Sequence, residues 1–243
     1  MEPEIYRTMA AVEESHWWFR SRRNIMRELL RRLDLPRDAI ILEPGCGTGG
    51  NFAMLSEFGR VYAMDSDPDA CEFARAKGIA TVERGELPSN IPFGDLRPDL
   101  VVMTDVLEHL ESDRDSLLAI RARLRAGGYL VATVPALPWL WSEHDVSHHH
   151  RRRYTAPVLR SLIETTGYKI RLLTYYNFIL LPLIAGVRIA QKVLPISSGI
   201  SDLREHRPMI NTLLLRLFSS ERYVIDRINV PIGTSLLVVA QKR

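Results

Sequence analysis

The chain has few cysteines and no leader-like start. Only Cys46 and Cys71 occur among 243 residues, which is too few for a disulfide framework and is typical of a reducing compartment. The first residues, MEPEIYRTMAAVEESHWWF, contain no basic segment followed by an apolar run, so they do not resemble a secretory signal. The sequence therefore predicts a cytoplasmic protein.

Long apolar runs are also missing. The longest run covers residues 178–187 and ends at Arg188 after ten residues, whereas a membrane-spanning helix needs about 20. We therefore expect no transmembrane helix. This stretch leaves two interpretations open, a buried core segment or a peripheral contact with a membrane surface.

An excess of charge of one sign is missing too. The chain carries 32 basic and 29 acidic side chains, a net charge of +3. Nucleic-acid binding normally requires a strong basic patch, and no Asn-Pro-Pro-Tyr-type motif for base methylation is present. We therefore expect no nucleic-acid partner.

The segments that are present alternate between two kinds. Short apolar runs typical of buried strands are followed by helical patterns, with the strands expected at 39–43, 60–64, 80–83, 99–104, 129–134, 168–174 and 234–240. Alternation of this kind predicts one α/β domain with a mostly parallel, doubly wound sheet.

A glycine-rich loop follows the first expected strand. Gly45, Gly47 and Gly50 allow a tight turn and a close approach of a ligand, and Asp65 ends the second strand, where an acid can bind both hydroxyls of a ribose. Glu43 precedes the loop; it would repel the pyrophosphate of NAD but would attract the ammonium and sulfonium groups of S-adenosylmethionine. The pattern favours S-adenosylmethionine and leaves an NAD(P)-dependent oxidoreductase as the alternative, although a Tyr-x-x-x-Lys pair is absent.

Four motifs in order resemble those of class I S-adenosylmethionine-dependent methyltransferases, especially the group that includes quinone-biosynthesis enzymes. They cover residues 41–49, 61–65, 101–109 and 124–130 within the region 38–174. The resemblance implies a Rossmann-like, seven-stranded sheet with an antiparallel last strand. It also implies that 1–35 form an N-terminal helical lid, 36–174 the cofactor-binding core, 175–233 a helical insertion and 234–243 the last strand.

The resemblance assigns the cofactor site residue by residue. Glu43 and the loop surround the methionine end, Asp65 holds the ribose, and 85–87 flank the adenine, although this last segment departs from the usual family pattern. The expected cofactor-binding residues are Glu43, Gly45, Cys46, Gly47, Gly49, Asn51, Asp65, Ser66, Gly85, Glu86, Leu87, Thr104, Asp105 and Val106.

Histidines mark the expected acceptor side. Residues 139–154 follow the fifth strand on the rim where ligands of this fold bind, and the resemblance extends to an Asp-x-x-x-Gly-His-x-Arg-Arg-Tyr pattern in which His149 replaces the glycine. A histidine near its usual pKa suits removal of a proton at neutral pH. The candidate catalytic residues are His109, His144, Asp145 and His150; a helix-capping role for His109 and a solvated basic loop at 144–154 remain the alternatives.

The acceptor itself is less constrained. Consecutive histidines such as 148–150 rarely bind one ion together, and no cysteine or paired carboxylate joins them, so we expect no metal site. The expected substrate-binding residues are Trp17, Trp18, Arg22, Arg152, Arg153 and Tyr154, although the first three also fit a helix packed on the sheet. We expect the insertion, apolar and edged with arginines, to wall the acceptor pocket or to contact a membrane or a second subunit; a cap on the core is the alternative.

Taken together, these features predict methyl transfer to a small-molecule or lipid-linked acceptor, at oxygen or carbon rather than nitrogen. The alternative outside the enzymes is a non-catalytic scaffold that binds S-adenosylmethionine and is associated with a membrane.

Overall fold

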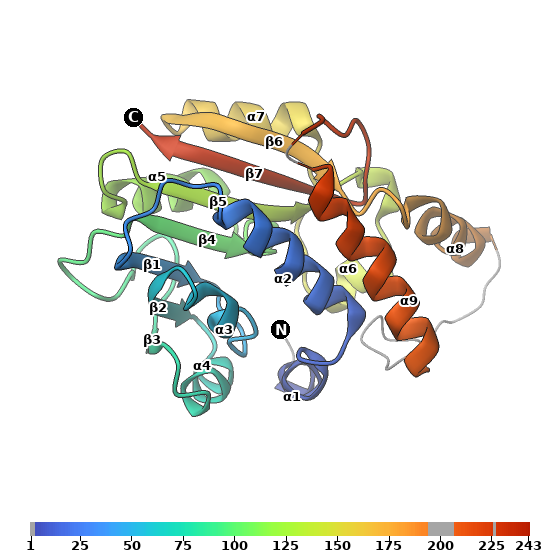
Figure 1. The fold of residues 1–243 in the computed structure, drawn as a ribbon, viewed down its shortest axis with the longest axis horizontal. Helices are drawn as coiled ribbons and strands as arrows, with labels where there is room; N and C mark the ends of the chain where they lie inside the picture. The colour runs from blue at the N-terminus through green and yellow to red at the C-terminus, as the bar shows by residue number, and fades with distance from the viewer. Residues whose placement is uncertain (1–2, 194–206, 226) are drawn as a thin grey trace.

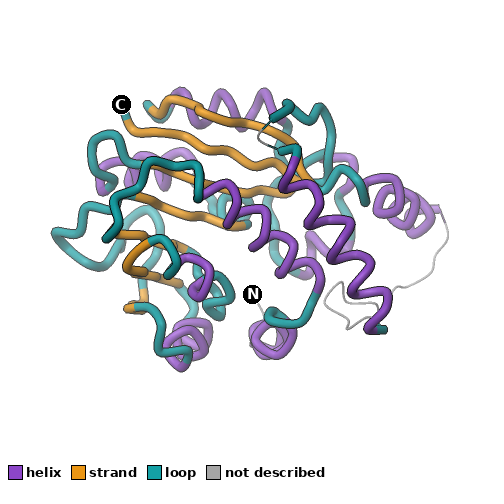
Figure 2. The backbone as a smooth tube through the Cα atoms, viewed as in Figure 1, coloured by secondary structure: helices purple, strands orange, loops and turns teal. Residues whose placement is uncertain are grey.

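The computed structural model describes residues 3–193, 207–225 and 227–243. Residues 194–206 and 226, which belong to the predicted insertion, lie outside this described part. A seven-stranded sheet runs through the molecule, and helices cover both of its faces (Figures 1 and 2). The predicted doubly wound α/β fold is confirmed.

The strands follow the order β3-β2-β1-β4-β5-β7-β6. They span β1 Ala39–Pro44, β2 Gly59–Asp65, β3 Thr81–Arg84, β4 Leu100–Thr104, β5 Tyr129–Pro135, β6 Tyr168–Tyr176 and β7 Ser235–Lys242. Neighbouring strands from β3 to β5 are parallel, whereas β7 is antiparallel to both β5 and β6. The central β4 is buried along its whole length, as expected for a strand with helices on both faces.

Two hydrophobic cores flank the sheet. One is formed with α2 (Trp17–Leu30), α3 (Phe52–Leu55), α4 (Pro68–Ala76) and α9 (Pro208–Ser219). The other is formed with α5 (Asp113–Arg123) and α7 (Ala156–Thr165). The remaining helices are α1 Pro3–Val12, η1 Pro138–Leu140, α6 Glu143–Ser147, α8 Leu181–Val193 and η2 Ser220–Tyr223.

The connection between β6 and β7 begins and ends at one rim. Ser235, the first residue of β7, pairs with Tyr176 at the end of β6 and with Pro135 at the end of β5. Both ends of the insertion therefore lie at the carboxyl edge of the parallel strands, where ligands bind in this class of fold.

The N-terminal region, for which the resemblance implied a helical lid, contains two helices. α1 precedes α2, and α2 packs alongside α9 in front of the sheet (Figure 1). Polar contacts fix this pair: the backbone N–H of Trp17 donates to Asn211 Oδ1 at 2.9 Å, and Asn24 Nδ2 donates to Ser219 Oγ at 3.1 Å. One helix of the N-terminal region and one helix of the connection between β6 and β7 thus lie in the same layer.

Candidate active site

The glycine loop turns sharply away from β1. Gly45 has φ +68°, and a Cβ atom there would lie 2.6 Å from Val106 Cγ2, so only glycine fits beside this segment. Gly47, at φ +54°, has its nearest neighbour 3.9 Å away, at Met9 Cε. The loop therefore packs closely on one side and leaves open space at Gly47, where a ligand can approach.

Asp65 lies opposite this loop at the end of β2. Its carboxylate accepts hydrogen bonds from the backbone N–H groups of Gly47, at 2.8 Å, and Asp67, at 3.0 Å. Burial raises the pKa of Asp65, although these backbone donors oppose the shift. Each carboxylate oxygen has more than one acceptor position. The geometry therefore fits a carboxylate that is already oriented and can still accept from ribose hydroxyls.

Glu43 lies behind the loop and is connected to it through Asn51. Asn51 Nδ2 donates to Glu43 Oε1 at 2.7 Å and approaches Thr104 Oγ1 at 3.1 Å. Glu43 Oε2 has no hydrogen-bond partner among the described residues, and burial raises the pKa of Glu43 to about 7. A buried carboxylate without a complete set of donors is stabilised by a nearby cation, which fits the positive end of S-adenosylmethionine.

The remaining cofactor candidates lie around the same hollow. A cavity of about 1070 Å³ is lined by most of the residues predicted to bind the cofactor, namely Gly45, Cys46, Gly47, Asn51, Asp65, Ser66, Gly85, Glu86, Leu87, Thr104, Asp105 and Val106. Glu43 and Gly49 do not line it. Glu43 lies behind Asn51, and Gly49 faces the ring of Phe52.

The N-terminal helices close one side of this cavity. Trp17, Trp18 and Arg22, the N-terminal residues predicted to bind the substrate, line it, and Arg22 forms an ion pair with Asp105. Arg23 anchors the same helix, because its guanidinium donates to the backbone oxygens of Glu13 at 2.7 Å and Gly50 at 3.1 Å. The segment before the first strand therefore covers the cavity and is held there by charged contacts.

Sequence reasoning missed the contribution of α1. Tyr6 and Met9 of α1 line the cavity, as does Glu13 directly after this helix. Glu13 accepts a hydrogen bond from Thr48 Oγ1 at 2.6 Å and forms an ion pair with Lys77. The available signal was the apolar residues of 5–12 at helical spacing, which is weak in so short a segment.

The histidine loop lies on another wall of the cavity. His109, His144, His150 and Arg153 line it, whereas Asp145 is completely buried beneath them. Asp145 Oδ1 lies 2.9 Å from His150 Nδ1 and accepts from Arg153 Nε at 2.7 Å. Burial alone would raise the pKa of Asp145, but these two hydrogen bonds outweigh it and hold the pKa well below its usual range. Asp145 therefore orients both side chains.

His149 occupies the position where the family pattern has glycine. Its φ is +55°, a left-handed conformation that glycine adopts freely and a side chain adopts at a cost. The loop thus keeps the backbone shape that a glycine would give, and His150 N–H closes the turn by donating to Asp145 O at 2.8 Å.

His109 and the preceding Glu108 face this loop. The rings of His109 and His150 are 4.8 Å apart and nearly perpendicular. Burial, together with the neighbouring His150, lowers the pKa of His109 to about 4, so that His109 is neutral at physiological pH. Glu108 is fully buried, and burial raises its pKa well above the usual range. Sequence analysis did not single out Glu108.

Two predicted substrate-binding residues do not reach the cavity. The Tyr154 hydroxyl donates to Asp113 Oδ2 at 2.7 Å and is 1% exposed, and Arg152 donates to the same oxygen at 2.9 Å. Arg152 also donates to the backbone oxygens of Leu110 and Glu111. Both side chains therefore attach the histidine loop to the start of α5, and their place in the structure is architectural.

The insertion supplies the apolar wall. Residues Leu180, Leu183, Ile184, Val187 and Arg188 of α8 and its approach, with Leu214 of α9, line the same cavity. One space thus has a polar end with the glycine loop and Asp65, a histidine wall, and an apolar wall.

Comparison with known proteins identifies the family. A family model described as a methyltransferase domain matches residues 17–173, which is more than half of the chain. The chain belongs to the S-adenosylmethionine-dependent methyltransferases. This confirms the resemblance seen in the sequence and the S-adenosylmethionine cofactor that it implied.

Curated relatives carry the same description. A Mycolicibacterium smegmatis protein named as an S-adenosylmethionine-dependent methyltransferase is 28% identical over 168 residues, which are 68% of this chain and 64% of that protein. A Mycobacterium tuberculosis protein named likewise is 27% identical over 165 residues, 67% of this chain and 59% of that protein. The matched region thus spans less than two thirds of either relative.

Solved structures show the same fold. A Haloferax volcanii methyltransferase, solved in complex with the methyltransferase activator Trm112, has a TM-score of 0.62 at 18% identity and covers 98% of this chain and 93% of its own. A Haemonchus contortus phosphoethanolamine N-methyltransferase in complex with S-adenosyl-L-methionine has a TM-score of 0.58 at 17% identity. The match covers 90% of this chain and 52% of the Haemonchus chain. Within the described part of this chain, no helix has both the length and the apolar character needed to cross a bilayer.

Proposed function

We propose that this methyltransferase transfers a methyl group from S-adenosylmethionine to a small-molecule or lipid-linked acceptor, at an oxygen or carbon atom. The observation that carries the proposal is the single cavity of about 1070 Å³ that joins the glycine loop and Asp65 to the histidine wall and the apolar wall. Ligand pockets measure about 300–1,000 Å³, so the volume of this cavity lies just above that range, and its three chemically different walls support a cofactor and an acceptor side by side.

The residues of the polar end would hold the cofactor. Asp65 accepts from the ribose hydroxyls, Glu43 acts through Asn51 on the positively charged methionine end, and the segments 85–87 and 104–106 flank the remainder. When bound, S-adenosylmethionine supplies a methyl group on a positively charged sulfur. Much of the catalysis is then positioning, since the acceptor atom must approach this methyl group in line.

The histidine wall would receive the acceptor's reacting group. Methylation of a hydroxyl requires removal of its proton, and a histidine oriented by a carboxylate is suited to accept it. His150 has this arrangement with Asp145, and His109 lies beside it. The sequence and the structure together favour His150, because the pKa of His109 is lowered to about 4 by burial, which makes His109 a weak base.

The apolar wall supports an acceptor with a hydrocarbon part. Leu183 and Val187 line the cavity and are also 60% and 48% exposed, so an apolar chain could extend from the cavity along α8 to the surface. Arg188, at the same wall, suits an anionic group on such a molecule.

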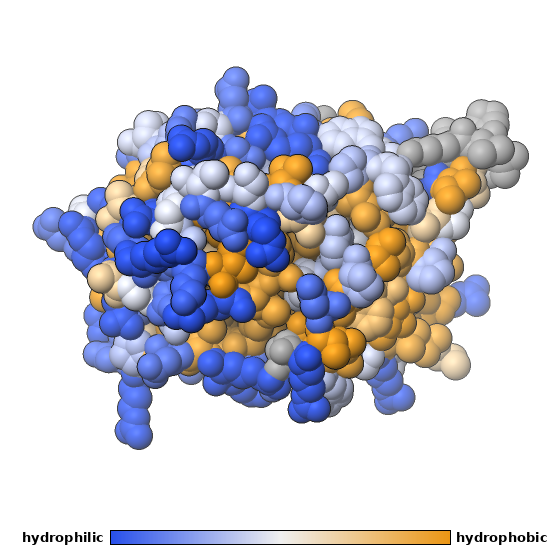
Figure 3. Space-filling model, turned by 90° about the horizontal axis from the view of Figure 1, so that it is seen from above, coloured by the Kyte–Doolittle hydropathy of each residue, from blue (hydrophilic) through white to orange (hydrophobic). Residues whose placement is uncertain are grey.

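We propose further that α8 and α9 contact a membrane surface. Met209, Ile210 and Leu213 of α9 are exposed, and apolar surface is prominent on the half of the molecule that carries α8 and α9 (Figure 3). Apolar helix faces edged with basic residues bind the interface of a membrane that contains anionic lipids. A second copy of the chain is the other occupant of this surface, and analytical ultracentrifugation without lipid separates the two.

The test of the function is turnover with a labelled methyl donor against panels of hydroxylated, phenolic and prenyl-linked acceptors. Formation of S-adenosylhomocysteine together with a methylated acceptor supports the proposal. Tight binding of S-adenosylmethionine without turnover on any acceptor class would favour the non-catalytic scaffold, and methylation of amines alone would contradict the assignment to oxygen or carbon.

A further inference from the structure

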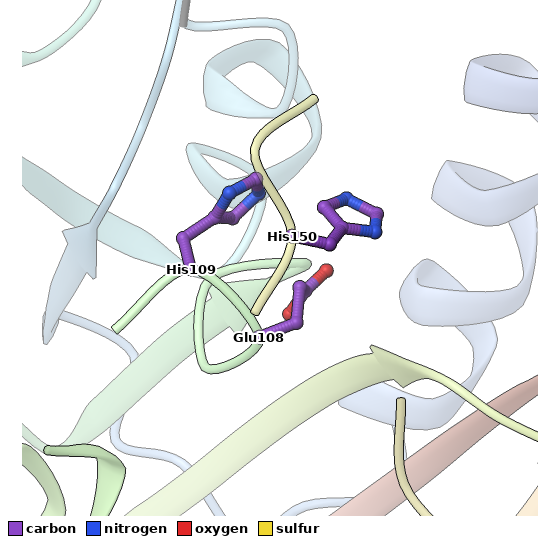
Figure 4. Close-up of side chains that lie close together, drawn as sticks. All are labelled: Glu108, His109 and His150. Atoms are coloured by element: carbon purple, nitrogen blue, oxygen red, sulfur yellow. The ribbon is translucent and has the colours of Figure 1, made fainter. Parts of the chain in front are cut away.

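Three side chains with metal-binding atoms meet at the histidine wall. Glu108, His109 and His150 each offer one ligand atom, and these atoms all lie within 4.8 Å of one another. Figure 4 shows the Glu108 carboxylate directed toward the two imidazole rings. Glu108 and His109 follow β4, whereas His150 comes from the loop after α6, so the tertiary fold brings the group together.

Glu108 lacks what a buried carboxylate normally has. It is 0% exposed, and neither of its oxygens has a hydrogen-bond partner on another of the described residues. The nearby guanidinium of Arg22 is paired with Asp105 instead. Burying a carboxyl group without donors is costly unless a cation or a proton compensates. An unpartnered carboxylate that faces two imidazoles is consistent with a bound metal ion.

His150 has the orientation of a metal ligand. Asp145 forms an ion pair with Arg153, and a carboxylate can only accept from His150 Nδ1. In the tautomer that donates from Nδ1 to Asp145, the lone pair of Nε2 is available to bind an ion. A carboxylate that orients a histidine in this way is the usual second partner of a metal-bound imidazole.

We propose that Glu108, His109 and His150 bind one zinc ion, with an open coordination position toward the cavity. Two imidazoles and one carboxylate are a ligand set that suits zinc, whereas magnesium and calcium prefer oxygen ligands throughout. Bonds from zinc to nitrogen or oxygen are about 2.0–2.2 Å long. Side-chain rotations that move each ligand atom by about 1 Å would therefore bring all three atoms to bonding distance from one ion. All three residues line the cavity, and three protein ligands with one open position are typical of a catalytic zinc site.

The role of the ion rests on the proposed function. An acceptor hydroxyl that binds zinc loses its proton to water, because the ion stabilises the resulting oxyanion. A bond then forms between this oxygen and the methyl carbon while the carbon–sulfur bond breaks, and its electron pair stays on sulfur. His150 would act here as a ligand instead of a base. This proposal departs from the sequence-based expectation of no metal site, which weighed the histidines of 144–150 without Glu108 and His109.

The experiment measures metal binding without cofactor or acceptor. The purified full-length chain is stripped with a chelator, dialysed and titrated with Zn²⁺ alone by competition with a chromophoric chelator, and Co²⁺ loading is followed by visible absorption. We expect one Zn²⁺ per chain and a Co²⁺ spectrum typical of four- or five-coordination. Failure of the wild-type chain to bind stoichiometric Zn²⁺ at micromolar concentration would overturn the proposal.

Variants identify the ligands. Glu108→Gln and His150→Ala should each weaken Zn²⁺ binding by more than about 100-fold, and Asp145→Asn, which removes only the orienting partner, by about 10- to 100-fold. His149→Asn is the matched control, because His149 is exposed and does not line the cavity. Equal Zn²⁺ affinity in Glu108→Gln, His150→Ala and the control would overturn the proposal, since the ion would then be held elsewhere.

A second measurement separates this site from the proposed function. Affinity for S-adenosylhomocysteine should be the same in the stripped and the zinc-loaded protein, because the cofactor residues are different. If Zn²⁺ binds as expected while no acceptor is ever methylated, the metal site stands and the proposed function fails. If methylation is found and is unchanged after complete removal of the metal, the catalytic role assigned to the ion is wrong.

Discussion

Arg22, on the second helix of the chain, forms an ion pair with Asp105 at the end of the fourth strand. The two side chains are 11% and 28% exposed, and both residues line the cavity. This contact joins the N-terminal cover directly to a segment that the family motif assigns to the cofactor. The position of the cover and the shape of the cofactor end are therefore coupled.

Replacing Arg22 by methionine should weaken this coupling. The variant leaves Asp105 without its counter-charge, and we expect a loss of about 1–3 kcal/mol in the free energy of unfolding together with weaker binding of S-adenosylmethionine. Urea denaturation and calorimetry measure the two effects. Arg20→Met, on the exposed face of the same helix, should change neither. If the losses in the free energy of unfolding caused by Arg22→Met and by Asp105→Asn simply add up in the double variant, the two side chains are not coupled as described.

Binding of S-adenosylmethionine should depend on pH through Glu43. Burial raises the pKa of Glu43 to about 7, opposed by Asn51 and Arg22 and supported by Glu13 and Asp65. A cationic ligand favours the ionised carboxylate, so affinity should rise with pH through this range, level off above it, and fall by at most tenfold per unit below it.

Calorimetry between about pH 5.5 and 8.5 in buffers of different ionisation enthalpy measures both the affinity and the protons released. Glu43→Gln is the matched variant, since the amide keeps the shape and cannot titrate. At high pH this variant should bind S-adenosylmethionine more weakly than the wild type does, and its affinity should change less with pH. An unchanged pH profile in Glu43→Gln would show that another group titrates.

Loss of His150 should affect turnover far more than cofactor affinity. Because His150 lies on the histidine wall and not at the glycine loop, we expect His150→Ala to lower kcat by about 100-fold or more and to leave the dissociation constant of S-adenosylhomocysteine within about twofold. His144→Ala should act in the same direction. Full activity in both variants with the true acceptor would show that the loop has only a structural role.

The exposed apolar face of α9 should bind anionic vesicles. Leu213 is 58% exposed, and a charge placed there opposes burial in the lipid interface. In sedimentation with vesicles that contain phosphatidylglycerol, Leu213→Glu should shift the protein to the supernatant. Leu118→Glu, on α5, is the control and should bind as the wild type does. Binding that is equal in the two variants, or absent from the wild type, would contradict a membrane contact through α9.

Much of the fold and of the cofactor end could be predicted from local patterns. The apolar strand 39–43, the glycines after it and Asp65 are determined by backbone geometry and by the period of the sequence, which act over a few residues. The α1 helix was missed because a single short segment gives little periodic signal.

The histidine wall could be predicted only in part, because its arrangement depends on distant contacts. Arg152 and Tyr154 suggest a ligand by their chemistry, but Asp113 on another element binds both. In the sequence Leu-Glu-His, nothing distinguishes Glu108 from an ordinary polar residue. The fold, however, buries it opposite a loop that lies about 40 residues later in the chain. Tertiary placement decides such roles, and local sequence does not contain it.

The most direct test of the account is calorimetric titration of S-adenosylmethionine into the wild type, Asp65→Ala and Glu72→Ala, with NAD as the comparison ligand. The wild type should bind S-adenosylmethionine and show no heat of binding with NAD. Asp65→Ala should bind about 10- to 100-fold more weakly, since it loses hydrogen bonds to a charged group worth roughly 1.5–3 kcal/mol, whereas Glu72, exposed on α4, should not matter. Unchanged affinity in Asp65→Ala, or preferential binding of NAD, would contradict the assignment of this cavity to S-adenosylmethionine.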